Sequence, residues 1–348
     1  MSITQSAKDT WNHIDPWNGL GHRLDPTSSV DTMLETADLD WSAIRSQLVA
    51  KVPPVDPEAD DVEVKVSPEA YALIKSSDNS VLSVVGARYK VIQNSEAFEV
   101  FHEIADMGNL EIEAAGQMEG GKTVWALAKM VDTEHFLSDS EYIAGYFLFQ
   151  QSFAQGSALK MMFMPMRFPS AASIIYHSTT GKNPVSFRLQ HCKKLSWANK
   201  EKIKDVVTNA RAEMKRVAEF ASIMADTHMR DEDALYFLCQ AMGQMPVFEA
   251  AKKAGVHTSL IDFAFDPVAG RTMSKVVQTL MADTEYTMPN HNAQSTSGSL
   301  WGYLLAVLYS IDHVLGHKHE TRLYSAWFGL NNKTKLATYD MAKRQISL

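Results

Sequence analysis

Cysteine is nearly absent from this sequence: Cys192 and Cys239 are the only two in 348 residues. Two thiols so far apart exclude a disulfide framework and a zinc site built from cysteine pairs, and they suit a reducing compartment. Long hydrophobic runs are also missing, since no stretch reaches the roughly 18 apolar residues of a membrane-spanning helix. Residues 1–19 lack the apolar segment of a secretory signal. We therefore expect a cytoplasmic protein that makes no use of a membrane.

Recognisable catalytic motifs are lacking too. The sequence has no Gly-x-Ser-x-Gly elbow and no carboxylate pair at a spacing typical of acid–base catalysis. His191 and Cys192 are adjacent, and adjacent residues of a strand point to opposite faces. His313, His317 and His319 cluster near an expected helix end, where histidines more often face solvent than bind a metal. We expect no catalytic residues, no metal and no cofactor; a metal site at these histidines is the weaker alternative.

What is present begins with an uneven distribution of charge. The net charge is −8, and residues 1–64 account for all of it, with four Lys or Arg and twelve Asp or Glu. The rest of the chain carries equal numbers of acidic and basic side chains. Within it, residues 182–216 hold ten basic and three acidic side chains. The pattern indicates a neutral body with a basic stripe, preceded by an acidic segment.

Residues 116–123, GQMEGGKT, satisfy the phosphate-binding pattern G-x-x-x-x-G-K-[ST]. A phosphate cradle needs a buried strand before the loop and a helix that begins at the Lys-Thr. The preceding residues 110–115 instead alternate and include two glutamates, as in a half-solvated antiparallel strand. Thr123, Val124 and Trp125 are strand formers, and Gly120-Gly121 suits a turn. This order predicts a β-hairpin; a P-loop ATPase is the minor alternative.

The residues before the hairpin predict a strand and a helix. Residues 84–92 alternate, with Ala87, Tyr89 and Val91 on one face and Arg88 and Lys90 on the other. Asn94 is a suitable N-cap for a helix with apolar residues at helical spacing, and Gly108 is a suitable residue to end it. The expected unit is strand, helix, strand, hairpin turn and strand.

Three regions follow from these patterns. Residues 1–80 contain six prolines and one short expected helix at 29–37, and we interpret them as an acidic arm and linker. Residues 81–195 hold the hairpin unit and further expected strands at 142–150, 158–168 and 185–191. Residues 196–348 have helical patterns. The predicted fold class is α+β, an antiparallel strand–helix–hairpin core with a helical C-terminal region.

Two expected helices stand out in the C-terminal region. In the first, apolar residues recur at alternating spacings of four and three: Ile203, Val207, Ala210, Met214, Val217, Ala221 and Met224. Its other faces are basic, so it is either a core helix with a solvated surface or a helix that lines a nucleic-acid or subunit groove. Residues 301–314 are apolar nearly all round, which predicts a buried helix.

Several segments carry a resemblance to a known family. They include PWNGLG (16–21), VVGARYKVIQNSEAF (84–98), AAGQMEGGKTVWALAKM (114–130), WGYLLAVLYSIDH (301–313) and SAWFG (325–329). Their order and spacing resemble the phage- and plasmid-encoded proteins grouped as domain of unknown function number 932. A more distant likeness, at the level of topology, is to ring-forming single-strand annealing proteins of recombination. That likeness implies a DNA-binding homo-oligomer in a bacterial host.

Annealing needs cations that follow the phosphates of single strands and aromatic faces that support bases. The candidate cations are Arg88, Lys90, Lys122, Lys129, Lys160, Arg167, Lys182, Arg188, Lys193 and Lys194. The candidate stacking residues are Tyr89, Trp125 and Phe153. A single lysine is more often simply solvated, and a single aromatic more often packs in the core. Only the cluster from Lys182 to Lys194 favours DNA binding over these commoner roles.

The leading hypothesis is a non-enzymatic phage or mobile-element protein that binds single-stranded DNA and promotes annealing as a ring or filament. The acidic arm would then mimic DNA or recruit a phage nuclease or a host protein. The alternative is a protein-interaction module, either an inhibitor of host defence or an assembly factor, for which DNA is incidental.

Overall fold

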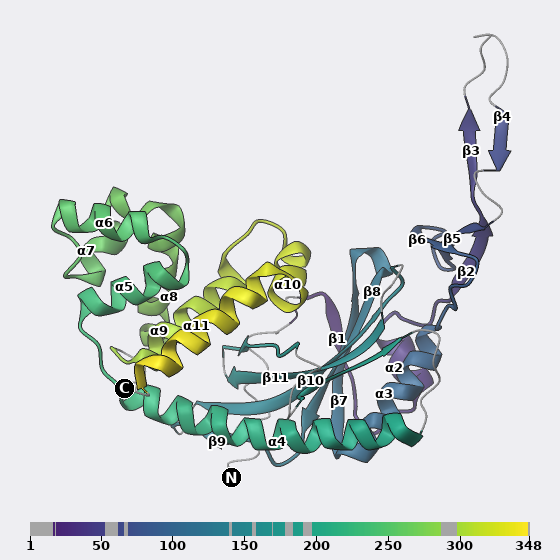
Figure 1. Cartoon of the computed structure of the whole chain (residues 1–348), viewed down its shortest axis with the longest axis horizontal. Helices are drawn as coiled ribbons and strands as arrows, with labels where there is room; N and C mark the ends of the chain where they lie inside the picture. The colour runs from purple at the N-terminus through teal and green to yellow at the C-terminus, as the bar shows by residue number, and fades with distance from the viewer. Residues whose placement is uncertain are drawn as a thin grey trace.

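The structure, a computed structural model, describes residues 17, 19–52, 62–65, 69–138, 141–154, 158–168, 170–177, 184–190, 197–286 and 298–346. Figure 1 shows a curled antiparallel sheet with a long helix along its lower side and a group of helices at one end. The mixed α+β fold class and the helical C-terminal region are thus confirmed.

The central sheet has the order β1-β7-β8-β10-β11-β12, with β9 also paired to β10 and β13 also paired to β11. Its strands are β1 (Gly21–Arg23), β7 (Leu110–Met118), β8 (Thr123–Met130), β9 (His135–Phe136), β10 (Tyr142–Ser152), β11 (Ala158–Phe168), β12 (Ala172–Ser173) and β13 (Ser186–Gln190). All these pairings are antiparallel. Strands β10 and β11 are buried almost throughout, so the core lies on both faces of the sheet.

Helices cover the sheet from different sides. Helix α3 (Asn94–Gly108) packs on β7 and β8, and α4 (Trp197–Asp226) runs beneath β10, β11 and β13 (Figure 1). The remaining helices are α5 (Asp231–Ala241), α6 (Met245–Ala254), α7 (Leu260–Phe265), η3 (Pro267–Ala269), α8 (Gly270–Tyr286), α9 (Leu300–Tyr309), the π-helical turn η5 (Ser310–Val314), α10 (His319–Phe328) and α11 (Leu330–Ile346). All seven seam residues predicted for α4 are buried, and α9 is buried along nearly its whole length. Both predictions are confirmed.

The hairpin prediction is confirmed as well. Strands β7 and β8 pair from Leu110–Met130 to Met118–Thr123, with a shift of register between Ile112 and Ala114, and the one-turn helix η2 (Glu119–Gly121) joins them. Lys122 is followed by a strand, so the helix that a phosphate cradle requires is not there. Glu119 and Gly120 both adopt positive φ, which is the reason a glycine suits this tip.

Two local predictions need correction. The strand expected at residues 84–92 is β6 (Val81–Gly86), and the chain turns after Gly86, so Arg88 and Lys90 lie in a loop. The N-cap of α3 is Gln93, whose N–H donates to the Glu96 carboxylate at 2.8 Å. Asn94 lies inside the helix, and its buried amide donates to the carbonyls of Leu39 and Trp41. The Asn94 side chain therefore forms long-range hydrogen bonds and does not cap the helix.

Much of the predicted arm is folded. Trp17, Leu24, Leu34 and Trp41 are buried in the common core, and β1 pairs with β7 at the edge of the sheet. The expected short helix is α2 (Val30–Thr36), capped by Ser29. Strands β2 (Ala43–Gln47), β5 (Ala70–Lys75) and β6 form a second sheet. Residues 17, 19–47 and 70–80 are therefore part of the body, whereas the division of the chain into domains stays a prediction.

One part of this region does leave the body. Strands β3 (Val49–Val52) and β4 (Val62–Lys65) form a two-stranded ribbon that projects from the molecule (Figure 1). Most of the acidic residues 56–63 fall outside the described residues. Within the described chain, no helix combines the length and the apolar character that crossing a bilayer requires.

Candidate nucleic-acid interface

Two of the predicted DNA-binding cations, Lys160 and Arg188, lie opposite each other on β11 and β13, close to where β13 meets α4. Within the described chain β13 pairs on one side only, with β11, so its other side is an edge of the sheet. The register places Lys160 opposite Arg188 and Met161 opposite Phe187. Because successive side chains of a strand alternate, Arg188 and Phe187 point to opposite faces. We call Lys160, Arg188 and Lys202 of α4 the basic edge.

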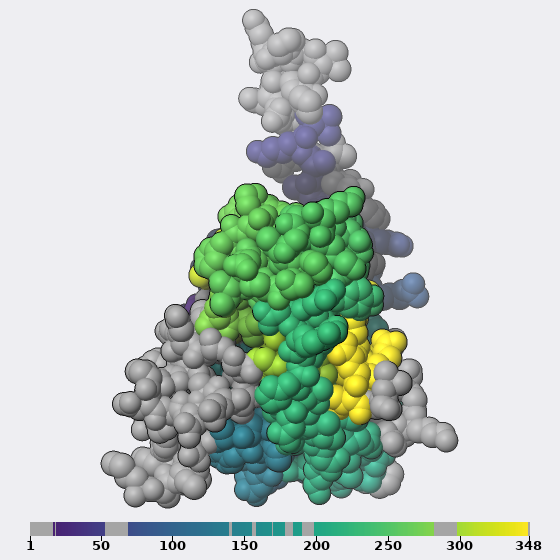
Figure 2. All heavy atoms as spheres, turned by 90° about the vertical axis from the view of Figure 1, so that its left-hand side faces the viewer, coloured from purple at the N-terminus to yellow at the C-terminus, as the bar shows by residue number. Residues whose placement is uncertain are grey.

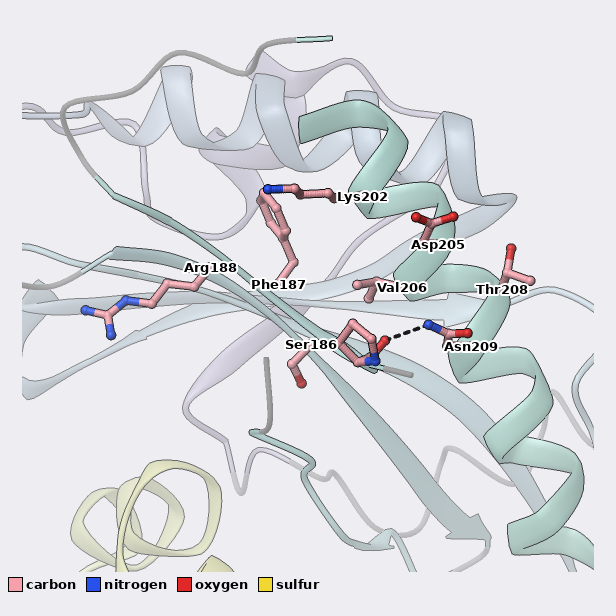
Figure 3. Close-up of a pocket in the computed structure, with 9 residues that line it drawn as sticks. Ser186, Phe187, Arg188, Lys202, Asp205, Val206, Thr208 and Asn209 are labelled. Atoms are coloured by element: carbon pink, nitrogen blue, oxygen red, sulfur yellow. Dashed lines mark hydrogen bonds between the residues drawn. The ribbon is translucent and has the colours of Figure 1, made fainter. Parts of the chain in front are cut away.

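A pocket of about 530 Å³ lies between β13 and α4. Figure 3 shows Phe187 and Lys202 on the helix side of β13, whereas Arg188 points away from α4. Asn209 of α4 donates from Nδ2 to the carbonyl oxygen of Pro184 at 3.1 Å, which fixes the start of β13 against the helix. The pocket also has one acidic lining residue, Asp205. The basic edge thus has a cation on each face of one strand.

Lys160 and Arg188 carry like charges and face each other across the paired strands. Burial lowers the pKa of Lys160, and the neighbouring charge of Arg188 lowers it further. Like charges directly opposite each other on paired strands are destabilising. An anionic group near the two cations would offset that repulsion.

The basic face of α4 is partly neutralised by its neighbours. Lys200 is ion-paired with Glu103 of α3, and Lys204 pairs with Glu201 on the same helix at 3.1 Å. Arg211 donates to the carbonyl oxygens of Val131 and Gly108, at 2.9 and 3.1 Å, and so secures α4 to the sheet. Much of the predicted stripe therefore has structural roles, and Lys202 is the α4 lysine that lines the pocket.

Other predicted cations belong to other elements. Arg88 and Lys90 are exposed in the loop after β6, and Lys122 is exposed at the hairpin tip. Lys129 is half-buried and forms an ion pair of 2.5 Å with Glu134. The structure does not bring these four residues to the basic edge. Lys182, Lys193 and Lys194 lie outside the described residues.

Three predicted contacts with DNA are wrong, because their side chains belong to the core. Arg167 is buried, and its Nε lies 3.0 Å from the Glu141 carboxylate. Trp125 is fully buried against Trp17 and Trp327. Phe153 is fully buried against Trp41, whereas Tyr89 is half-buried. The residue types placed Trp125 and Arg167 in strands correctly but could not show that both faces of this sheet are covered.

Phe187 is the aromatic that sequence reasoning missed. Its ring is half-buried and lines the pocket beside Lys202 (Figure 3). The signal was available, because Phe187 lies next to Arg188 within the strand expected at 185–191. An aromatic beside cations is the composition that single-strand-binding grooves use.

The hairpin tip is engaged by two distant parts of the chain. The Glu119 N–H donates to the carboxylate of Glu320 on α10, and Lys75 of β5 donates to Gln117 at 3.1 Å. A side chain at Gly121 would meet the Trp41 ring at 2.9 Å. The GQMEGGKT segment is thus a packed junction between the two sheets and the helical region.

Comparison with family models matches residues 81–327 to the domain of unknown function DUF932. The match covers more than half of the chain, which therefore belongs to this family. Neither the curated proteins nor the solved structures include a match.

Proposed function

We propose that this DUF932 protein binds single-stranded DNA at the basic edge and promotes annealing as a homo-oligomer, a ring or filament, in the cytoplasm of a bacterium that carries the phage or mobile element. The reaction breaks no covalent bond. It needs cations along a path and a surface that leaves the base edges free to pair.

The cross-strand pair of Lys160 and Arg188 carries the proposal. Two cations held opposite each other at the margin of a sheet reduce stability unless an anion shares them. A phosphodiester backbone that follows β13 supplies such anions at regular intervals. The half-buried Lys160 gains most, because burial and Arg188 both disfavour its charged form in the free protein.

Two neighbouring features support the same surface. Phe187 offers a ring on the α4 side of β13, and Lys202 lies beside it (Figure 3). In sequence, β13 lies between Lys182 on one side and Lys193 and Lys194 on the other. A base stacked on Phe187 with its phosphate near Lys202 combines the two interactions that non-specific single-strand binders use.

A salt-titrated binding measurement tests the proposal. A labelled 30-nucleotide strand is titrated with the wild type and with Lys160→Ala/Arg188→Ala, and fluorescence anisotropy is recorded at several salt concentrations. We expect the logarithmic salt slope to fall by about 1.4 for the two lost single-strand contacts. Lys253→Ala, an exposed lysine of α6, is the matched control and should keep the wild-type slope. No binding by the wild type at low salt would refute the proposal.

Annealing and assembly are measured separately. Complementary strands carrying a fluorophore and a quencher report the annealing rate, and mass photometry reports particle size with and without DNA. We expect the particle to grow on single strands and the rate to rise with it. A wild-type monomer that ignores DNA would leave the second candidate.

That second candidate is a protein-interaction module, and the projecting ribbon favours it. Val49 and Val52 on β3 are exposed by 45% and 47%, away from the body of the protein. An exposed two-stranded ribbon can pair with a strand of a partner, such as a nuclease or a host protein. Replacing both valines by threonine should abolish capture of such a partner while leaving oligonucleotide binding unchanged.

A further inference from the structure

A second pocket, of about 540 Å³, lies where α10 begins, and none of its lining residues belongs to β13 or α4. Its volume is within the range of small-molecule sites, about 300–1,000 Å³. Met242, Ile311 and Leu315 provide apolar wall, and Lys318, Thr321 and Arg322 line it from α10 and its cap. Figure 2 views the molecule from the side on which α5, α6, α7 and α8 lie in Figure 1. We call this cavity the α10 pocket.

Arg322 is the unusual feature of the α10 pocket. The residue is only 8% exposed, and its Nε has no hydrogen-bond partner within the described chain. A buried nitrogen of a charged group without a hydrogen-bond partner is costly, so natural proteins usually supply one. Burial lowers the pKa of Arg322, which the charge of Asp312 opposes, but the guanidinium remains charged.

Asp312, the carboxylate whose charge acts on Arg322, is already engaged. Asp312 accepts from the buried Lys335 ammonium at 2.6 Å and from the Ser173 N–H at 3.0 Å. Lys335 is itself fully buried, so its charge needs Asp312. The pair Asp312–Lys335 is thus internally balanced, and Arg322 adds one positive charge beside it.

The start of α10 adds to the positive character of the same pocket. The helix has ten residues, and its N-cap Lys318 provides no capping hydrogen bond from its side chain. The first N–H groups of a helix and its dipole together favour an anion. Lys318, Thr321, Arg322 and Ser325 all line the pocket at positions that share one face of the helix.

We propose that the α10 pocket binds a small organic molecule through its phosphate group. Arg322 and the first N–H groups of α10 hold the phosphate oxygens, Lys318 contributes a second charge, and the hydroxyl groups of Thr321 and Ser325 donate hydrogen bonds. The apolar wall of Met242, Ile311 and Leu315 takes the organic part. This site is independent of DNA binding at the basic edge.

Calorimetric titration of the full chain with inorganic phosphate and with phenyl phosphate tests the site. Phenyl phosphate should bind more tightly than inorganic phosphate because its ring uses the apolar wall, and phenol alone should not bind. Arg322→Met should weaken phenyl phosphate at least about tenfold, since it removes hydrogen bonds to a charged group. Equal affinity of the wild type and Arg322→Met for phenyl phosphate, or equal binding of phenol, would overturn the proposal.

Two further variants keep the test decisive if Arg322→Met does not fold. Lys318 is exposed, and Lys318→Ala should weaken phenyl phosphate about threefold, as expected for one solvated charge. The exposed Lys333 of α11 does not line the pocket, and Lys333→Ala should bind as the wild type does. An equal loss in both variants would show only a general charge effect and would overturn the site.

Cross-measurement separates this proposal from the proposed function. Lys160→Ala/Arg188→Ala should keep phenyl phosphate affinity, and Lys318→Ala should keep oligonucleotide affinity. If Lys160→Ala/Arg188→Ala lost affinity for phenyl phosphate and Lys318→Ala did not, the phosphate would bind at β13, and the proposed site in the α10 pocket would be refuted. Failure of DNA binding with intact phenyl phosphate binding would refute the proposed function alone.

Discussion

Two basic side chains on β11, Arg167 and Lys160, have different surroundings in the structure. Arg167, near the end of the strand, is buried with Glu141, whose Oε1 also accepts from Trp301 at 2.8 Å. Lys160, near its start, is half-buried and faces another cation across the strands. Compensation inside the protein marks the first group as structural. The second group faces a like charge, and the proposed function gives that pair of cations a role in binding DNA.

The first way to test this comparison is to remove a residue that was predicted to stack on DNA but lies in the core. Trp125→Ala deletes a fully buried ring between Trp17 and Trp327. We expect a loss of about 4 kcal/mol in the free energy of unfolding, from lost burial and the cavity left behind. Urea denaturation measures it; a stable variant that binds DNA poorly would instead assign Trp125 to the interface.

The next effect concerns the compensated pair. Glu141→Gln leaves the Arg167 charge buried without its counter-ion, and we expect a loss of about 3 kcal/mol. Glu141→Gln/Arg167→Met removes both charges and should recover much of that loss. The urea midpoints of the single and double variants measure this recovery. No recovery would mean that packing, rather than charge, determines the stability at this site.

The third effect is pH-dependent and smaller. Burial lowers the pKa of His313 below its usual value near 6.5. The unfolded chain therefore binds the proton more readily, so stability is lost as pH falls from about 6.5 towards the folded pKa. His313→Gln should reduce the difference in unfolding free energy between pH 7.5 and pH 5. An unchanged difference would assign the acid sensitivity to other groups.

The smallest effect on stability belongs to the basic edge. Lys160→Ala/Arg188→Ala removes a cross-strand repulsion, so the free energy of unfolding should change by less than about 0.5 kcal/mol or rise slightly. Thermal denaturation with the same samples used for DNA binding measures it. A large destabilisation would place these cations with Arg167, among the structural charges.

Local patterns in the sequence predicted the local parts of the fold. Alternation before Gly116 and strand formers after Lys122 specify the hairpin, and the spacing from Ile203 to Met224 specifies the buried face of α4. The predicted N-cap of α3 was wrong because the Asn94 amide donates hydrogen bonds to the carbonyl oxygens of Leu39 and Trp41, more than fifty residues away. Long-range ties of this kind leave no periodic signal.

Some residues of the candidate site could be predicted from the sequence, but their positions relative to one another could not. Arg188 and Lys160 were both candidates, but only the pairing of β11 with β13 shows that they face each other. Arg167, like Arg188, is an arginine in an expected strand. Its burial depends on Glu141 and Trp301, which belong to other parts of the chain. The α10 pocket joins residues from 242 to 334 and had no local motif.

The pairing of β1 with β7 has a practical consequence for expressing this protein. A chain cut to the matched residues 81–327 would lack β1, leaving the backbone groups of β7 without their partners at Gly21–Arg23. It would also lack Trp17, which packs on Trp125, and Lys335, the counter-ion of Asp312. An open strand edge and an uncompensated buried carboxylate both promote aggregation or unfolding. The segment that defines the family is therefore shorter than the segment that should be produced for experiments.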